Sequence, residues 1–280
     1  MIGIACSSGL LAEYIIATYL PYTGTTVMNT AMAALTFVAF YFSVETPYFS
    51  VTKERRKGAQ QNLSWLYGED ASQSKVDDEM RRIEKSIAEE KPKTQSLKLL
   101  LSAANLKVII LVVSVIMLTT ATGINVARTY GSLIFSPWNS LTANEFMIMF
   151  GVATLMAVSV SPFFIEKVDR RSVIIVCCLG ITVCHICSYL LMYLHNRGYE
   201  FTIYPWLIFC SVAVYGMFYQ AMLPALFAIN GELLPFSVRA IGCSLAITGF
   251  SVASFCNTKM FSPISENFGK ELNFLIYAGV

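Results

Sequence analysis

The sequence predicts an all-α protein that crosses a membrane several times, and three observations support this prediction. Hydrophobic residues make up 55% of the 280 residues and charged residues only 14%, whereas soluble domains carry about 25% charged residues. Long apolar stretches without strand-like alternation recur along the chain. Eleven of the 20 Lys and Arg residues and nine of the 18 Asp and Glu residues lie between residues 51 and 98. This pattern argues against a water-soluble enzyme, and the net charge of +2 does not indicate a nucleic-acid partner.

Seven apolar stretches are long enough to cross a bilayer, which takes about 20 helical residues. They lie at 3–22, 25–43, 106–127, 145–165, 172–194, 204–229 and 240–261. An eighth begins near Leu272 and is a short stub that ends with the sequence at Val280. Backbone polar groups cannot be left unpaired in lipid, so we expect helices. The apolar opening and the final stub favour a piece of a larger protein.

The expected organisation has three parts. Residues 1–45 form two membrane helices, residues 46–104 form a polar loop with short amphipathic helices, and residues 105–280 form a second helical group whose last helix is truncated. Basic residues gather in alternate connections: the large loop, the connection with Lys167, Arg170 and Arg171, and the one with Arg239. The excess of positive charge marks these connections as cytoplasmic. We expect an integral protein of the plasma membrane with the large loop in the cytoplasm.

The large loop contains two helical patterns. The first runs from Gly58 to Gly68 and the second from Asp77 to Glu90. Their expected apolar faces are Ala59, Leu63 and Leu66 in the first and Met80, Ile83 and Ile87 in the second. We interpret the loop as a solvated connector that packs on the cytoplasmic face, in preference to a dedicated partner-binding site.

Eight cysteines lie in apolar stretches, where a thiol behaves as a small hydrophobic group. The run Cys184-His185-Ile186-Cys187 has the residue types of a metal or redox site, but no second ligand pair accompanies it. We therefore expect no metal and no cofactor. Because no acid–base pair or metal cluster converges, an enzyme is not expected either.

Several short motifs follow one another at the expected cytoplasmic edge. Val44–Phe49 (VETPYF) precedes the helical pattern of Gly58–Gly68, Glu166–Arg171 reads EKVDRR, and Ile229–Arg239 reads INGELLPFSVR. Gly123-Ile124-Asn125 lies within the third apolar stretch. In this order the motifs resemble those of the sugar porter family of the major facilitator superfamily, with insect facilitated trehalose transporter-like proteins nearest. The resemblance covers family helices five to eleven and the start of helix twelve.

The resemblance implies a major facilitator fold and facilitated diffusion of a sugar, trehalose or hexose-like, by alternating access. The implied partners are a small sugar or polyol and the lipid bilayer. Because the first four family helices and the C-terminal motif are absent, transport by this chain alone is in question. Alternatives are a non-transporting homologue that acts as a receptor or accessory subunit, and a degenerate gene product. A seven-helix receptor is disfavoured, because the large charged loop follows the second span and the N-terminus is expected in the cytoplasm.

The resemblance also implies a set of substrate-binding residues near the middle of the membrane. These are Asn125, Thr119, Thr120, Thr154, Phe218, Tyr219 and Phe227. Thr119 and Thr120 replace paired glutamines of the family, and Tyr219 replaces a glutamate. A threonine reaches less far and offers fewer hydrogen bonds than a glutamine, so weaker hexose binding is expected.

Charged residues at the cytoplasmic ends of the helices can pair across the two halves of a carrier and hold an inward gate shut. The candidates are Glu45, Glu166, Arg170, Arg171, Glu232 and Arg239. Exposed pairs contribute only about 0–1 kcal/mol, which suits contacts that break in each cycle. The alternative is that the arginines only set the topology.

Arg128 is a lone charge within the third apolar stretch. If it faces a cavity it is a functional residue, paired with Tyr130 or a substrate oxygen. If it lies at the outer end it only snorkels to the headgroups, which is the interpretation we prefer. Pro224 is expected to kink the sixth span, for gating or for packing.

Overall fold

The computed structural model confirms an all-α fold. It describes residues 2–53, 55–68, 73–90, 102–135, 142–165, 167–199, 203–234 and 236–280. Every regular element within these ranges is a helix. The chain divides into two compact units, which are described separately. Unit 1 comprises Met1–Tyr22 and Leu100–Val280, and unit 2 comprises Thr23–Leu99.

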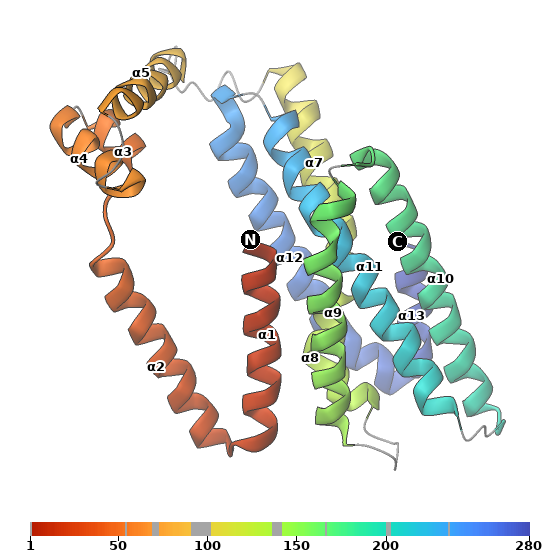
Figure 1. The fold of residues 1–280 in the computed structure, drawn as a ribbon. Coiled ribbons are helices and arrows are strands. Elements are labelled where there is room, and N and C mark those ends of the chain that lie inside the picture. The colour runs from red at the N-terminus through yellow and green to blue at the C-terminus, as the bar shows by residue number, and fades with distance from the viewer. Residues whose placement is uncertain are drawn as a thin grey trace. The chain divides into compact units, whose positions relative to one another are not determined.

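Unit 1 is a bundle of long helices that run side by side (Figure 1). Its helices are α1 (Ile2–Tyr19), α7 (Ala103–Ala121), α8 (Ile124–Phe135), α9 (Ala143–Ile165), α10 (Arg170–Asn196), α11 (Tyr204–Leu233), α12 (Phe236–Phe268) and α13 (Lys270–Ala278). Helix α11 packs between α9 and α10, α12 packs on α7, α13 packs on α10, and α1 packs on α9. The α1–α9 contact therefore brings the beginning of the chain against its second half.

Five helical segments of the described residues are long and apolar enough to cross a membrane. They are Asn105–Phe135, Ala143–Phe164, Arg170–Asn196, Tyr204–Ile229 and Ile241–Phe268. Each overlaps one of the last five stretches predicted from the sequence. The first two predicted stretches correspond to α1 and to α2 (Tyr22–Tyr41), and α13 occupies the predicted stub. The count of seven spans stays a prediction.

The span at Asn105–Phe135 differs from the expected single helix at 106–127. It consists of α7 and α8, which are separated at Thr122 and Gly123. Gly123 has φ +91°, a left-handed conformation that residues with a side chain rarely adopt. After this break the helix continues eight residues beyond the predicted end, to Phe135. By contrast, α11 continues past Pro224.

Local sequence explains where α9 begins. Thr142 and Glu145 form a capping box, in which Glu145 Oε2 accepts from the Thr142 backbone N at 2.7 Å and the Glu145 N donates to Thr142 Oγ1 at 3.4 Å. The next residue, Phe146, is fully buried and stacks on Phe135 of α8, with ring centroids 5.3 Å apart. The cap and the aromatic pair together fix α9 against α8.

Unit 2 contains α2 from Thr23 onward and three short helices, α3 (Pro47–Thr52), α4 (Arg56–Tyr67) and α5 (Gln73–Glu90). Thr46 caps α3 by accepting from the Phe49 N at 3.4 Å, with Pro47 at the first helical position. The VETPYF motif is therefore a helix start.

A small core holds α3, α4 and α5 together. Its buried members are Ala59, Leu63, Val76, Met80 and Ile83, with Val51 and Ile87 packed against them. The predicted apolar face of the second loop helix is confirmed. In the first, Ala59 and Leu63 are buried, whereas Leu66 is 64% exposed, so only part of the predicted apolar face is covered.

Candidate functional site

The break between α7 and α8 is the centre of the candidate site. Asn257 of α12 donates its Nδ2 to the carbonyl oxygens of Thr120 and Ala121, each at 3.2 Å. Tyr215 of α11 donates its hydroxyl to the Thr122 carbonyl at 3.0 Å. These carbonyls lie at the end of α7, where regular helix hydrogen bonds stop. Two neighbouring helices thus supply hydrogen-bond donors to carbonyl groups that lipid could not hydrogen-bond.

Three of the predicted substrate-binding residues flank this break. Thr119 and Thr120 end α7, and each donates its hydroxyl to the Ile116 carbonyl of its own helix, at 2.9 and 2.8 Å. Asn125 lies in the first turn of α8 and donates its Nδ2 to Ser254 Oγ of α12 at 2.7 Å. The structure therefore brings these three together, with a structural partner for each.

Thr154 of α9 lies where α9 meets α11. Its side chain is fully buried, and its hydroxyl donates to the Gly151 carbonyl at 3.0 Å. A Cβ atom at Gly216 of α11 would come within 3.0 Å of Thr154 Cγ2. Thr154 thus occupies a tight helix contact.

The three aromatic candidates on α11 have different surroundings. Tyr219 is 2% exposed, whereas Phe227 is 67% exposed. Phe218 packs toward α10, because a Cβ atom at Gly180 would lie 2.7 Å from its ring. Tyr219 and Phe227 therefore do not meet in one enclosed space, and the role of all seven residues in sugar binding stays a prediction.

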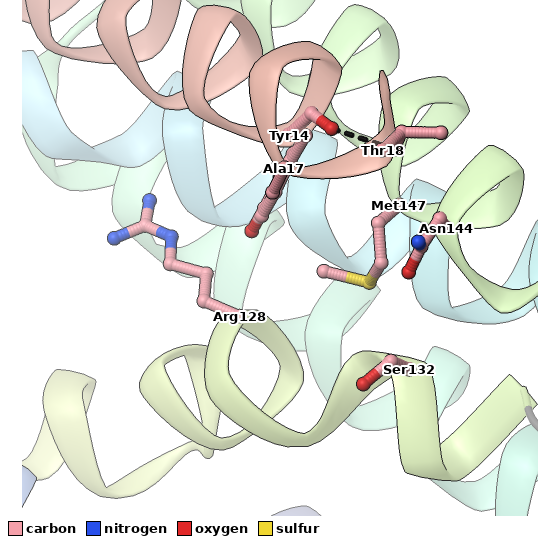
Figure 2. Close-up of a pocket in the computed structure, with 7 residues that line it drawn as sticks. All are labelled: Tyr14, Ala17, Thr18, Arg128, Ser132, Asn144 and Met147. Atoms are coloured by element: carbon pink, nitrogen blue, oxygen red, sulfur yellow. Dashed lines mark hydrogen bonds between the residues drawn. The ribbon is translucent and has the colours of Figure 1, made fainter. Parts of the chain in front are cut away.

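A pocket of about 130 Å³ lies between α1, α8 and α9 (Figure 2). It is lined by Tyr14, Ala17, Thr18, Arg128, Ser132, Asn144 and Met147. Figure 2 shows the Tyr14 side chain directed from α1 toward α8, and the Arg128 side chain rising from α8 on the other side. None of the seven predicted substrate-binding residues lines this pocket.

Arg128 is held by a chain of hydrogen bonds that joins three helices. Its Nη2 donates to Gln220 Oε1 of α11 at 3.1 Å, and Gln220 Nε2 donates to Ser7 Oγ of α1 at 2.6 Å. Gln220 and Ser7 are 3% and 2% exposed. The preferred interpretation of Arg128 as a snorkelling side chain is therefore wrong. Tyr130, its suggested partner, instead stacks on Phe261, with ring centroids 4.9 Å apart.

Sequence reasoning missed Gln220, Tyr215, Ser254 and Asn257, which hold the break and the pocket. The available signal was a polar side chain inside an otherwise apolar stretch. Such residues are rarely left without a partner in a membrane interior. The sequence does not show which helix supplies that partner.

The basic residues of the predicted gate lie at helix starts. Arg170 and Arg171 open α10, and Arg239 lies in the first turn of α12. The Arg239 Nε donates to the Leu234 carbonyl at the end of α11, at 3.3 Å. This bond joins the ends of two consecutive helices.

Of the acidic residues in the predicted gate, the structure describes the side chain of Glu45. Glu45 is an exposed residue of unit 2, and its carbonyl accepts from Asn62 Nδ2 at 2.9 Å. Glu232 lies on α11, but its side chain is outside the description, and Glu166 lies outside the described residues. The gate contacts stay a prediction.

His185 and Cys184 are buried in α10, whereas Cys187 is exposed. The His185 ring lies 4.3 Å from the Tyr215 ring, between centroids. Among the described residues, no group of three or more His, Cys, Asp or Glu side chains could hold a metal ion.

Similar solved structures show the fold. The structure of the xylose transporter XylE from E. coli in a partially occluded inward-open conformation matches 99% of this chain and 59% of that chain, with a TM-score of 0.73 at 18% identity. A second structure, of the proton:xylose symporter XylE bound to 6-bromo-6-deoxy-D-glucose, matches with a TM-score of 0.72. The chain thus has the fold of the major facilitator superfamily.

The chain is also similar in sequence to curated sugar transporters. The facilitated trehalose transporter Tret1 of Bombyx mori is 25% identical over 264 residues, which cover 93% of this chain and 52% of that protein. Tret1 of Anopheles gambiae is 24% identical over 276 residues, covering 97% of this chain and 34% of that protein. The chain thus spans between a third and about half of these relatives. The family model described as "Sugar (and other) transporter" matches residues 2–280, and the chain belongs to this family of integral membrane transporters.

Proposed function

We propose that this chain takes part in facilitated transport of a sugar, trehalose or hexose-like, by alternating access. The family membership and the relatives that carry trehalose or xylose support the substrate class. The structural observation that carries the proposal is the interrupted helix α7–α8. Carriers commonly build their substrate sites at such breaks near the membrane midplane, where backbone and side-chain polar groups are both available.

The proposed substrate surface consists of the predicted residues Asn125, Thr119, Thr120, Thr154, Phe218, Tyr219 and Phe227. Asn125 is the residue expected to matter most, because its amide can exchange Ser254 for a sugar hydroxyl. The hydroxyls of Thr119 and Thr120 already bond their own helix. They are expected to contribute less than the glutamines that they replace.

The membrane arrangement belongs to the same proposal. The proposed arrangement has seven spans and a stub. Residues 1–45 and 105–280 contain the membrane helices, and the loop at 46–104 connects them in the cytoplasm, under the plasma membrane. The gate residues Glu45, Glu166, Arg170, Arg171, Glu232 and Arg239 would close the cytoplasmic side. Cysteine labelling from either side of the membrane tests this arrangement.

Transport is tested by reconstituting the 280-residue chain in liposomes and measuring counterflow of labelled trehalose, glucose and xylose. We expect exchange of at least one sugar, and a reduction of about tenfold for Asn125→Ala, which corresponds to about 1.4 kcal/mol. Asn267→Ala is the matched control, because Asn267 is exposed and its Nδ2 donates to the Pro263 carbonyl of its own helix. Sugar binding without counterflow would favour the accessory role, and the absence of both would contradict the proposal.

A further inference from the structure

The pocket at Arg128 contains a positive charge that the described residues do not neutralise. Arg128 lies on α8 inside the span Asn105–Phe135. A guanidinium stays charged in proteins, and a charge at the centre of a membrane helix costs about 2.5–3.5 kcal/mol even by moderate scales. Such a charge usually faces a counter-ion or a cavity. Here it faces the cavity between α1, α8 and α9.

The hydrogen bonding of Arg128 is incomplete. Its Nη2 donates to the neutral amide oxygen of Gln220, while its Nε is buried and has no partner in the part of the chain that the structure describes. The ion pairs found among the described residues, Arg56–Glu84 and Arg82–Glu79, lie elsewhere, in unit 2. A buried donor without an acceptor costs about 1–3 kcal/mol, and more if the group is charged.

The remaining lining of the pocket offers further donors and no carboxylate. The Tyr14 hydroxyl is buried and, among the described residues, has no partner. Thr18, Ser132 and Asn144 complete the polar part, while Ala17 and Met147 supply an apolar wall. The Thr18 hydroxyl already donates to the Tyr14 carbonyl at 2.7 Å. Glu13, the neighbour of Tyr14 in the chain, is not among the lining residues. Within the described residues, the pocket thus combines a cation without a counter-ion, a hydroxyl donor without an acceptor and an apolar wall.

We propose that this pocket binds the carboxylate of an anionic sugar, with a uronate as the simplest case. The inference rests on the proposed function and specifies its substrate class. A carboxylate accepts charge-assisted hydrogen bonds from Arg128 Nε and from the Tyr14 hydroxyl, and it neutralises the charge that Gln220 only solvates. A neutral sugar hydroxyl supplies the acceptor but not the charge.

The size of the pocket agrees with this assignment. Its volume is about 130 Å³, slightly below the roughly 150 Å³ of an engineered protein cavity that admits benzene. It has room for a carboxylate and the adjoining carbon atoms of a ring, while the rest of the sugar extends toward the open side. The pocket is therefore suited to act as an anion subsite.

The test measures the affinities of the full chain, purified in detergent, for labelled D-glucuronate and D-glucose by equilibrium dialysis. The two ligands differ at carbon six, where glucuronate has a carboxylate and glucose a hydroxymethyl group. We expect glucuronate to bind more tightly, and Arg128→Gln to reduce that preference at least tenfold. Lys259→Gln is the matched control, because it removes one positive charge from an exposed position of α12 and should leave the preference unchanged.

A second variant keeps the test decisive if Arg128→Gln does not fold. Tyr14→Phe retains the charge and removes one donor, so the affinity for glucuronate should fall severalfold while the affinity for glucose stays the same. An unchanged preference in both folded variants, or tighter binding of glucose by the native chain, would overturn the inference and leave the proposed sugar transport standing. If glucuronate binds in an Arg128-dependent way and glucose does not bind, the inference is supported, and an anionic sugar rather than a neutral one is the substrate. Binding of neither ligand contradicts the inference, and the counterflow assay with trehalose and xylose then decides the proposed transport separately.

Discussion

Two polar regions of unit 1 differ in how many of their polar groups have hydrogen-bond partners. At the α7–α8 break, Asn257 and Tyr215 occupy the carbonyls of Thr120, Ala121 and Thr122. In the Arg128 pocket, the Arg128 Nε and the Tyr14 hydroxyl remain buried without partners in the described residues. Both regions lie within a membrane-type bundle, where an unpaired polar group is costly. The comparison indicates that the carbonyls of the break are held in a structural joint, whereas the pocket keeps two donors for the ligand that we propose.

The largest effect is expected at the break itself. Gly123→Ala would force a side chain into φ +91° and bring its Cβ within 2.7 Å of the Tyr277 ring. We expect destabilisation by about 2–5 kcal/mol from the backbone strain and the overpacking together. The thermal midpoint in detergent, compared at one scan rate, measures this loss.

Gly198→Ala separates the two causes. Gly198 has a similar φ of +88°, but nothing lies within 4 Å of the added Cβ. Its destabilisation should be limited to about 1–2 kcal/mol from the backbone alone. Equal losses in the two variants would show that Tyr277 does not limit the space at the break.

The next effect concerns the carbonyls that Asn257 holds. Asn257→Ala removes both hydrogen bonds. The Thr120 carbonyl keeps the Gly123 backbone N at 3.3 Å, whereas the Ala121 carbonyl loses its side-chain partner, so the variant should cost about 1–3 kcal/mol. Asn257→Asp places a carboxylate against the carbonyls, so it should be at least as harmful. A midpoint unchanged by both variants would contradict the description of the break as a satisfied joint.

Tyr215→Phe is expected to have a smaller effect. It removes the bond to the Thr122 carbonyl but keeps the ring that packs against His185. The loss should be about 1 kcal/mol, the lower end of the cost of leaving one acceptor without its partner. Tyr277→Phe, on a neighbouring ring, is a suitable comparison, because the Tyr277 hydroxyl makes no hydrogen bond within the described part of the chain.

Much of the fold followed from the sequence, because long apolar stretches in a membrane protein admit few structures. The predicted starts and ends of the later helices agree with the structure to within a few residues, apart from the ends of α8 and α12. The break at Gly123 was missed because a glycine inside an apolar run does not by itself indicate a left-handed residue. That conformation depends on Asn257 and Tyr215, which approach from helices more than 90 residues away.

The site was harder to predict, because its polar partners also come from helices that are distant in the sequence. Arg128 was recognised as unusual, but its environment depends on Gln220 and Ser7, which come from different helices. A pattern along one helix cannot show whether a charge reaches the headgroups or turns inward. Leu66 illustrates the same limit in unit 2, since helical spacing predicts a shared face but not how far the neighbouring helix extends over it.

The smallest expected change provides the sharpest contrast with the break. Tyr14→Phe removes a buried hydroxyl that has no partner among the described residues, and so it should leave the thermal midpoint unchanged or raise it by the equivalent of up to about 1 kcal/mol. The same chemical change at Tyr215 should lower the midpoint, because that hydroxyl bonds the Thr122 carbonyl. Measurement of both variants in ligand-free protein compares, in the same bundle, a tyrosine hydroxyl without a described hydrogen-bond partner and one that donates a hydrogen bond. A loss at Tyr14 as large as that at Tyr215 would mean that the Tyr14 hydroxyl already has a structural partner, and the pocket could then no longer be distinguished from the joint.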